Sequence, residues 1–416
     1  MLWKIWNHIN VAYSTQNSMI IGIDASRANI AQQTGTELYS YTLIEEFKKL
    51  ADLNDRFILY SKDKLKYGLE ILPPNFDSQV LRWPPKFLWT QIRLSFAMVM
   101  RRQDVLFVPA HTIPLHHPKN TVVTVHDIGF EQIDRLYDKK MIGSGGVSRR
   151  VLSAGARLFT LGKYSASELD YHRWATEYAI RHAKKIITVS EFTKNEIIKR
   201  YGISINKVAV IYHGINRAVF KKINDTAAIK KTLDNMKISS PFLLYVGRLE
   251  EKKNTPGLIK IFRILKTKYK MPHQLVLVGK PGLNYDAVNK LIDQYNLNAF
   301  VVRPGYVNEG ELIHLRNAAD VFVFPSLYEG FGMPILESMA CGTPVVCSRA
   351  ASLPEVAGDA ALMANPEDYE EFASKIHRVV ADADIRNGLI NRGWERISHF
   401  RWDECAKKTL DVIKEP

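Results

Sequence analysis

The sequence predicts an α/β protein in which two doubly wound domains face a central cleft. Short apolar runs alternate with helical patterns along both halves of the chain, which is typical of a parallel sheet wrapped by helices. The runs do not alternate polar with apolar residues, so we expect both faces of the strands to be buried. A length of 416 residues, 46% of them hydrophobic, is enough for two or three domains.

An extension, residues 1–18, precedes the first predicted strand. It has scattered apolar residues but no continuous core of a signal peptide. A misassigned start codon explains it more simply than a small amphipathic anchor. In the first half of the chain the predicted strands are 20–24, 57–60, 105–108, 121–125 and 186–189, and the predicted helices are 37–50, 91–102 and 192–201.

The second half has the clearer pattern. Its predicted strands are 242–246, 274–278, 300–302, 321–324 and 344–347, and its predicted helices are 258–269, 286–295, 311–319 and 334–340. The stretch before them, 224–240, has few strand features and is predicted to be helical or a linker. We therefore place the boundary near residues 220–240, with domains at 19–220 and 221–400.

The chain is strongly basic, with a net charge of +14 and a pI of about 9.4. Such a balance favours an anionic partner: nucleic acid, anionic lipid or a phosphorylated substrate. No signature of a nucleic-acid-binding module is present. A charged surface that only solvates the protein is the alternative.

Neither a membrane span nor a metal-binding cysteine cluster is predicted. No run of eighteen apolar residues occurs in the sequence. The three cysteines, Cys341, Cys347 and Cys405, have no ligand-like spacing. Their odd number favours reduced structural thiols of a cytoplasmic protein.

Residues 139–171 form an irregular segment. A Gly-Ser-Gly-Gly run at 143–146 is followed by basic residues among leucines and a phenylalanine. A basic amphipathic helix can lie on a membrane surface. An ordinary helix packed on the first domain is the alternative.

The most informative stretch runs from Phe324 to Val346. Two carboxylates, Glu329 and Glu337, are separated by seven residues, with a Gly-Phe-Gly turn and then Pro334 between them. This layout predicts a strand, a loop and a helix, because proline suits the first helical turn. Free N–H groups at such a turn bind anions, and carboxylates can accept from hydroxyls, so the stretch can hold a sugar nucleotide. Alternatively, Glu337 only complements the helix N-terminus and Glu329 is solvated.

A second motif, Val-Gly-Arg-Leu-Glu-Glu-Lys-Lys-Asn, occupies residues 246–254 between a predicted strand and a helix. Arg248 and Lys253 are expected to point into the cleft from the carboxyl edge of the sheet. Fixed cations there would stabilise the charge that grows on a departing diphosphate. Two solvated surface cations are the alternative, and the neighbouring Lys252 leaves open which lysine points inward.

Together these motifs resemble those of the retaining glycosyltransferases of family 4. These have the GT-B architecture, in which two Rossmann-like domains face a cleft. The resemblance covers roughly residues 19–413. It implies that Arg248 and Lys253 bind the donor diphosphate, that Glu329 contacts sugar hydroxyls and that Glu337 contacts ribose hydroxyls. Alignment to the motif selects Lys253 over Lys252.

The resemblance also implies roles for looser motifs. His126, at a strand end, would lie near the anomeric carbon of the donor and is expected to be catalytic together with Arg248, Lys253 and Glu329. A helix at about 401–416 would pack back on the first domain. His213 replaces the more common asparagine of its turn, and its role stays open. The donor-binding residues so implied are Gly35, Thr36, Arg248, Lys253, Tyr306, Val307, Glu329, Gly330, Phe331, Gly332 and Glu337. A helix-capping turn is the alternative for Gly35 and Thr36, and Tyr306 and Val307 would act mainly through their backbone.

The implied activity is transfer of a hexose, first of all mannose from GDP-mannose, to a glycan or lipid-linked acceptor in cell-surface polysaccharide synthesis. Peripheral contact of the basic chain with an anionic cytoplasmic membrane face is expected if the protein transfers sugars in this way. No cofactor and no metal are expected, because Arg248 and Lys253 would neutralise the diphosphate. The Asp-Ala-Asp sequence at 382–384 is interpreted as a helix boundary or cap. Alternatives are a phosphorylase or epimerase of the same architecture, a non-catalytic sugar-nucleotide-binding subunit and, more remotely, a nucleic-acid binder.

Overall fold

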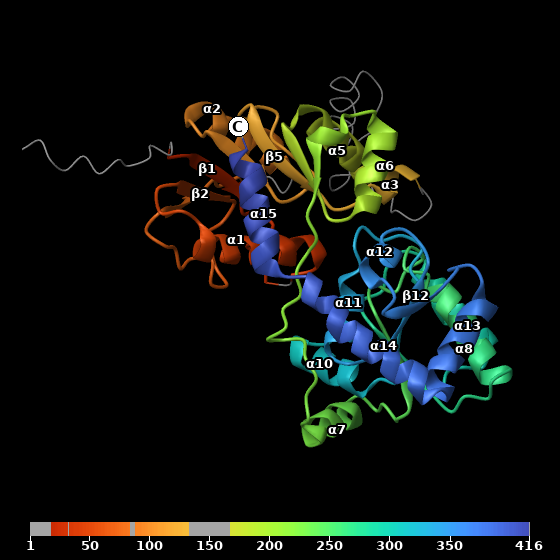
Figure 1. Cartoon of the computed structure of the whole chain (residues 1–416). Helices are drawn as coiled ribbons and strands as arrows, with labels where there is room; N and C mark the ends of the chain where they lie inside the picture. The colour runs from red at the N-terminus through yellow and green to blue at the C-terminus, as the bar shows by residue number, and fades with distance from the viewer. Residues whose placement is uncertain (1–17, 32, 84–87, 133–166, 416) are drawn as a thin grey trace, which may run out of the picture.

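The computed structural model describes residues 18–31, 33–83, 88–132 and 167–415 (Figure 1). It consists of two α/β domains, one above the other in the view of Figure 1, each built on a parallel sheet. The predicted α/β fold class of two doubly wound domains is thus confirmed. Residues 1–17 of the predicted extension and 139–166 of the basic segment lie outside the described residues.

The first sheet has the strand order β3-β2-β1-β4-β5-β6-β7, and every neighbouring pair is parallel. Its strands are β1 (Ile20–Asp24), β2 (Arg56–Ser61), β3 (Phe76–Val80), β4 (Val105–Val108), β5 (Asn120–Val125), β6 (Lys185–Thr188) and β7 (Val208–Val210). Its helices are α1 (Gly35–Leu50), a π-helix (Trp89–Leu94) that continues into α2 (Ser95–Met100), α3 (Gly129–Gln132), α5 (Glu168–His182), α6 (Glu191–Tyr201) and a 3-10 turn (Ile205–Lys207).

The second sheet has the order β10-β9-β8-β11-β12-β13, again all parallel. Its strands are β8 (Phe242–Val246), β9 (Gln274–Val278), β10 (Val301–Gly305), β11 (Val321–Phe324), β12 (Val345–Ser348) and β13 (Ala361–Ala364). Its helices are α7 (Thr226–Asn235), α8 (Thr255–Thr267), α9 (Tyr285–Gln294), α10 (Glu309–Ala318), α11 (Met333–Ala340), α12 (Leu353–Ala357), α13 (Tyr369–Ala381), α14 (Ala383–Arg396) and a 3-10 turn (Ile397–His399).

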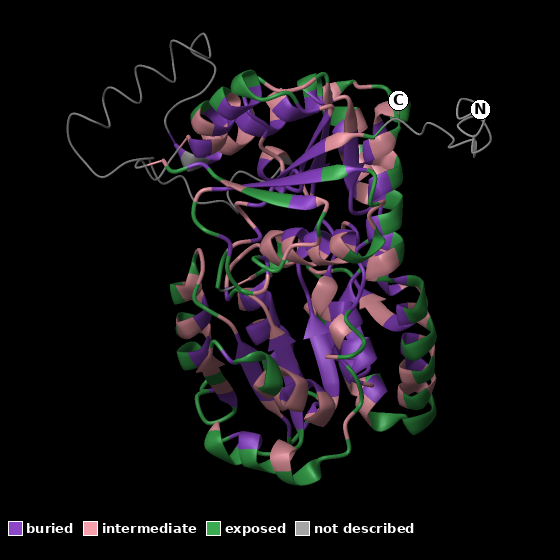
Figure 2. Cartoon of the chain, turned by 90° about the vertical axis from the view of Figure 1, so that its left-hand side faces the viewer, coloured by how far each residue is buried: buried purple, intermediate pink, exposed green. Residues whose placement is uncertain are grey.

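Helices cover both sheets, and the strands of the second sheet show their burial as near-continuous purple in Figure 2. Strands β4, β8 and β11 are apolar on both faces, as a sheet covered on two sides requires. The last helix, α15 (Trp402–Lys414), packs against α1 of the first domain, and Cys405, Leu410 and Ile413 join its core. Helix α7 contributes Leu233 to the second core. The precise domain limits stay a prediction.

Several helices begin where local chemistry fixes them. Ser190 caps α6 by accepting from the Thr193 N–H, and Asn308 forms a capping box with Glu311 at α10. Pro334 lies in the first turn of α11, as predicted. In the described part of the chain, no helix combines the length and the apolar character needed to cross a bilayer.

The central strands are confirmed, whereas the strands that were missed lie at the sheet edges. Strands β3, β7 and β13 were not predicted, and each lies at an edge of its sheet. The predicted strand 300–302 is in fact β10, the fourth edge, which runs on through Pro304 to Gly305. An edge strand tolerates proline and polar residues because one of its sides has no ladder to maintain, so its sequence signal is weak.

Candidate active site

The order of the second sheet reverses between β8 and β11. Strands β9 and β10 lie on one side of this pair and β12 and β13 on the other. Crossover helices from the pair therefore leave in opposite directions and cover opposite faces, which opens a crevice at the carboxyl ends. The loop after β8 contains Arg248 and Lys253, and the loop after β11 contains Glu329.

Lys253 and Glu329 meet at this crevice. The Lys253 Nζ donates to both carboxylate oxygens of Glu329, at 2.6 and 2.7 Å. The two side chains are only 20% and 11% exposed, so the charges neutralise each other in a partly desolvated place. The pair joins two of the predicted site residues that are 76 positions apart in the sequence.

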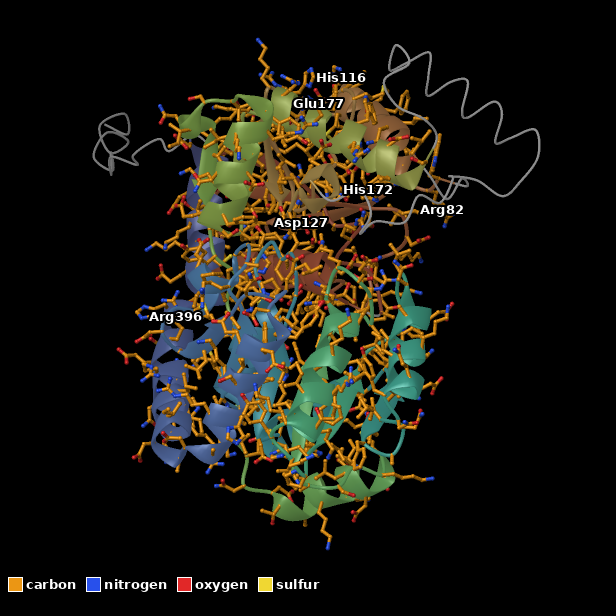
Figure 3. The ribbon with its side chains drawn as sticks, turned by 90° about the vertical axis from the view of Figure 1, so that its right-hand side faces the viewer. Arg82, His116, Asp127, His172, Glu177 and Arg396 are labelled. Carbon is orange, nitrogen blue, oxygen red and sulfur yellow. The ribbon has the colours of Figure 1, made fainter. Side chains whose placement is uncertain are left out.

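Lys252 also points inward, but toward the first domain. Its Nζ lies 3.5 Å from the Asp127 carboxylate and over the ring of Tyr328. Burial alone would raise the pKa of Asp127, but the Lys252 charge and a hydrogen bond from the Gly129 N–H outweigh it and hold this pKa below its usual value. Figure 3 shows Asp127 where the first domain faces the second. The two neighbouring lysines thus form ion pairs with different domains: Lys253 pairs with Glu329 of the second domain and Lys252 with Asp127 of the first.

Arg248 is the more accessible cation of the site. Its side chain is 69% exposed and its Nε lies 3.7 Å from the Glu250 carboxylate. The preceding Gly247 has φ +155, and an added Cβ there would lie 2.8 Å from the Tyr245 hydroxyl. Tyr245 in turn donates to the Arg248 carbonyl. The backbone of this turn is therefore held while the guanidinium stays in solvent.

The turn Gly330–Gly332 lies directly on the first domain. Ser190 donates its hydroxyl hydrogen to the Gly330 carbonyl at 2.8 Å, and an added Cβ on Gly330 would lie 2.0 Å from the His126 carbonyl oxygen. Ser352 fixes the same turn from behind by bonding the carbonyls of Glu329 and Phe331. The predicted residues His126 and Gly330 are therefore in backbone contact across the domain boundary.

His126 belongs to an aromatic cluster that sequence reasoning did not find. Its Nε2 lies 3.1 Å from the Pro109 carbonyl oxygen, and its ring meets Tyr39 edge-on at 4.8 Å. Burial lowers the pKa of His126, so it is neutral at pH 7. His213 stacks on Tyr39 and on Trp402 and also contacts the Phe331 ring.

The cluster links four elements: α1, the end of β5, the turn before the second domain, and α15. His213 is 5% exposed, and burial holds its pKa well below the usual value. Its role, left open by the sequence, is thus to pack as a neutral ring. The sequence could not have assigned Trp402 to this cluster, because 276 positions separate it from His126 and no periodic pattern covers such a distance.

Glu337, the second glutamate of the motif, lies in the middle of α11 with its side chain 13% exposed. It forms an ion pair with Arg316 of α10, a residue that the sequence analysis did not single out. Gly332, with φ +114, is the N-cap of α11, and Phe331 is buried. The motif therefore places its first glutamate in the crevice and its second against a buried arginine.

The remaining predicted residues are more loosely placed. Gly35 and Thr36 are the first residues of α1 rather than a loop before it, because α1 begins two residues earlier than predicted. Gly35 is exposed, and an added Cβ there would have no atom within 4 Å.

Tyr306 is 61% exposed beneath the Lys280 ammonium, whereas Val307 is buried in the second core. In the described residues, neither Arg248 nor Tyr306 bonds to another predicted site residue.

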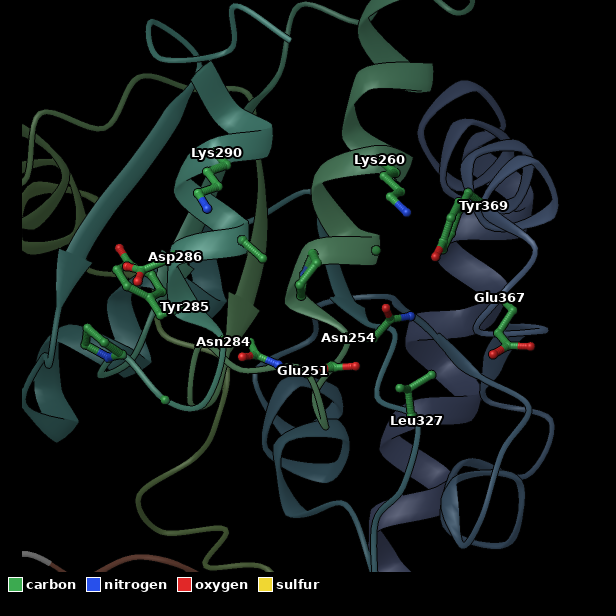
Figure 4. Close-up of a pocket in the computed structure, with 15 residues that line it drawn as sticks. Glu251, Asn254, Lys260, Asn284, Tyr285, Asp286, Lys290, Leu327, Glu367 and Tyr369 are labelled. Atoms are coloured by element: carbon green, nitrogen blue, oxygen red, sulfur yellow. Dashed lines mark hydrogen bonds between the residues drawn. The ribbon is translucent and has the colours of Figure 1, made fainter. Parts of the chain in front are cut away.

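A sizeable cavity is lined by none of the predicted site residues. It encloses about 860 Å³ between the starts of α8, α9 and α13, and Figure 4 shows Lys260, Lys290 and Tyr369 around it. Helix α8 covers the face of the sheet opposite to α11, so the cavity and Glu337 are on different faces. Leu327 closes its floor, and the Leu327 N–H bonds the Lys252 carbonyl. This hydrogen bond joins the loop after β11 to the loop after β8 beside the cavity.

Metal ligands are not grouped in the described part of the chain: no three His, Cys, Asp or Glu side chains there could share an ion. Asp382 is the N-cap of α14 and accepts from the N–H groups of Asp384 and Ile385, which confirms its interpretation as a cap. The three cysteines are free and buried, and burial raises the pKa of each thiol.

The family profile described as Glycosyl transferases group 1 matches residues 229–396, and that described as Glycosyltransferase Family 4 matches residues 34–219. O-antigen chain mannosyltransferase B of Escherichia coli is 32% identical over 62% of this chain and 68% of its own length. O-antigen chain mannosyltransferase RfbU of Salmonella typhimurium is 26% identical over 83% of this chain and 87% of its own length.

The fold is shared with solved GT-B structures. HepE of Anabaena, solved with UDP and glucose, has a TM-score of 0.66 at 17% identity, covering 96% of this chain and all of that chain (100%). The fold is thus GT-B, and the family matches make the protein a glycosyltransferase. The chain belongs to glycosyltransferase family 4.

Proposed function

We propose that this glycosyltransferase transfers mannose, with retention of configuration, from a nucleotide diphosphate sugar to a hydroxyl of a glycan or lipid-linked acceptor. The acceptor would belong to the synthesis of a cell-surface polysaccharide. Two relatives support this sugar and this setting, since both are named as O-antigen chain mannosyltransferases. GDP-mannose is the first donor to test.

The observation that carries the proposal is the Lys253–Glu329 pair at the reversal point of the second sheet. Ligands of such sheets bind outside the carboxyl ends at this place. Lys253 and the exposed Arg248 would meet the diphosphate and stabilise the charge that grows as the glycosidic bond breaks. Glu329 would then be released from Lys253 to accept hydrogen bonds from sugar hydroxyls.

The acceptor would approach from the first domain. In the scheme that we propose, its hydroxyl attacks the anomeric carbon on the face that the diphosphate leaves, and its proton passes to the departing phosphate oxygen. No side chain has to be a strong base, which suits a His126 whose pKa is lowered by burial. The His126 carbonyl would lie toward the positive charge that develops on the sugar.

The test is thermal unfolding of the full chain with GDP-, UDP-, TDP- and ADP-sugars in the presence of EDTA. A ligand that binds only the native state raises Tm by mass action. A clear shift with GDP-mannose supports the donor site and its independence of metal. The absence of any shift contradicts it and favours a different role, such as a non-catalytic subunit for another ligand.

Product analysis separates the remaining enzymes. A transferase forms a glycoside and releases the nucleoside diphosphate only in proportion to acceptor. Release of a free sugar phosphate instead would indicate a phosphorylase, and a changed sugar still attached to its nucleotide would indicate an epimerase. An α-linked product from the α-linked donor would establish retention.

We also propose peripheral contact with an anionic membrane in the cytoplasm. The net charge of +14 supports this, because basic surfaces are attracted to anionic lipid. The test is sedimentation with vesicles of phosphatidylglycerol and phosphatidylcholine against pure phosphatidylcholine. Equal binding to both vesicles, or binding to neither, contradicts the proposal.

A further inference from the structure

Arg316, on α10, is the largest fully buried side chain of the described residues, with an exposed fraction of 0%. Its guanidinium lies over the Phe322 ring at 5.1 Å and the Phe220 ring at 5.9 Å. Burying a permanent charge is costly unless it is paired and hydrogen-bonded. The buried guanidinium therefore needs a counter-charge and hydrogen-bond acceptors around it.

All side-chain hydrogen bonds of Arg316 go to one helix, α11. Its Nη1 donates to the Pro334 carbonyl at 3.0 Å and to the Ser338 hydroxyl, and its Nη2 donates to the Glu337 carboxylate. Ser338 passes its own hydrogen to the Pro334 carbonyl at 2.8 Å. The fork of a guanidinium is planar and rigid, so these anchors fix the plane in which it meets Glu337.

The backbone of Arg316 is held as firmly as its side chain. The Thr343 hydroxyl, from the turn between α11 and β12, donates to the Arg316 carbonyl. The arginine thus joins the middle of α11 to the turn that follows it. The Glu337 carboxylate is attached through Oε2, while its side chain keeps an exposed fraction of 13%.

The charge of Arg316 also acts on the ionisation of Glu337, whose pKa stays above its usual value. Burial raises the pKa of Glu337, and the Arg316 charge opposes this rise. An ionised carboxylate only accepts hydrogen bonds, whereas a protonated one must also place its own hydrogen. The arginine therefore favours the form that can receive two hydroxyl donors.

We propose that Arg316 is a positioning residue, which holds the Glu337 carboxylate as an oriented acceptor for the two ribose hydroxyls of the nucleotide donor. This inference rests on the proposed function, because it needs a ribonucleotide in the crevice. A vicinal diol offers two donors side by side, and a fixed carboxylate can meet them only if its plane is set beforehand. The arginine sets that plane without touching the nucleotide.

The experiment compares the affinities of GDP and UDP with those of their 2′,3′-dideoxy counterparts, by calorimetry on the full chain. The wild type should prefer the ribonucleotide by roughly tenfold or more, as for hydrogen bonds to a charged group. Arg316→Met should abolish most of this preference, as Glu337→Ala should. The double variant should lose no more than either single variant, because both remove one interaction.

A purely structural role of Arg316 would weaken ribo- and dideoxyribonucleotides equally and leave the preference unchanged. That result overturns the inference. The matched control is Arg396→Met, since Arg396 of α14 donates its hydrogen bonds to the main-chain carbonyls of Glu355 and Val356 and lies over the Phe400 ring. It is expected to alter stability and to leave the preference intact.

Two further variants keep the test decisive if Arg316→Met does not fold. Arg316→Lys retains the positive charge but loses the planar guanidinium. Ser338→Ala removes one hydrogen-bond acceptor of Arg316 and retains the charges of Arg316 and Glu337. Each variant should reduce the preference for ribonucleotides in part. An unchanged preference in both contradicts the inference. A wild type that binds no nucleoside diphosphate would instead refute the proposed function, and a wild type that binds without preference refutes the inference alone.

Discussion

Gly330 lies so close to the first domain that no side chain fits there. An added Cβ would lie 2.0 Å from the His126 carbonyl oxygen and 2.9 Å from the Asp127 Cβ, whereas real Cβ atoms essentially never approach closer than 3.0 Å. The nearest atom is main chain at the end of β5 and cannot swing aside. Gly330→Ala therefore has to separate the turn from the first domain by about 1 Å, the difference between 3.0 and 2.0 Å.

This displacement of about 1 Å determines the expected loss of activity. A misplacement of about 1 Å in an active site costs roughly 10²-fold in rate. Overpacking of this kind lowers the free energy of unfolding by about 1–3 kcal/mol, which leaves the protein folded. We expect kcat/KM to fall about 10²-fold, measured as release of nucleoside diphosphate from the nucleotide sugar that raises Tm most.

The matched control is Gly388→Ala in α14. There the nearest atom to an added Cβ is the flexible Nη1 of Arg392, at 3.3 Å. Alanine is the better helix residue by roughly 0.5–1 kcal/mol, so activity should be unchanged and Tm equal or higher. If Gly330→Ala is as active as the wild type, the close contact with His126 does not exist in the reacting state and the reasoning is refuted.

Three further predictions use other parts of the site. Arg248→Ala and Lys253→Ala should each reduce turnover by about 10²-fold or more, and near-normal rates in both would contradict the diphosphate assignment. The Glu355 carboxylate accepts hydrogen bonds from the first two N–H groups of α6, at 2.6 and 3.1 Å, and so links the two domains. Glu355→Gln should weaken this link and increase the radius of gyration in small-angle scattering. An unchanged radius of gyration would contradict the role of this contact. Burial lowers the pKa of His111 to about 3, so its contribution to stability is complete above its unfolded pKa of about 6.5 and is lost as pH falls toward 3. Denaturant titrations should show a loss of about 1–2 kcal/mol between pH 7 and pH 5 that is smaller in His111→Gln; equal losses would exclude His111 as the cause.

The sequence by itself determined the fold class and the central strands. Buried parallel strands have continuous apolar runs, such as β8 and β11, and these are readable without any knowledge of their neighbours. It also determined the start of α11, because Pro334 fits a first helical turn. Three edge strands, β3, β7 and β13, were missed because only one of their sides is paired, which leaves their composition free.

Only the tertiary structure decided how the site residues pair. The lysine doublet illustrates this: Lys253 meets Glu329, and Lys252 meets Asp127 of the other domain. Partners that are 76 and 125 positions apart leave no periodic signal along the chain. The same holds for Arg316, which looks like a surface residue of an amphipathic helix in the sequence. Packing of α10 against α11 makes it a buried charge, because a carboxylate, a hydroxyl and a carbonyl converge there.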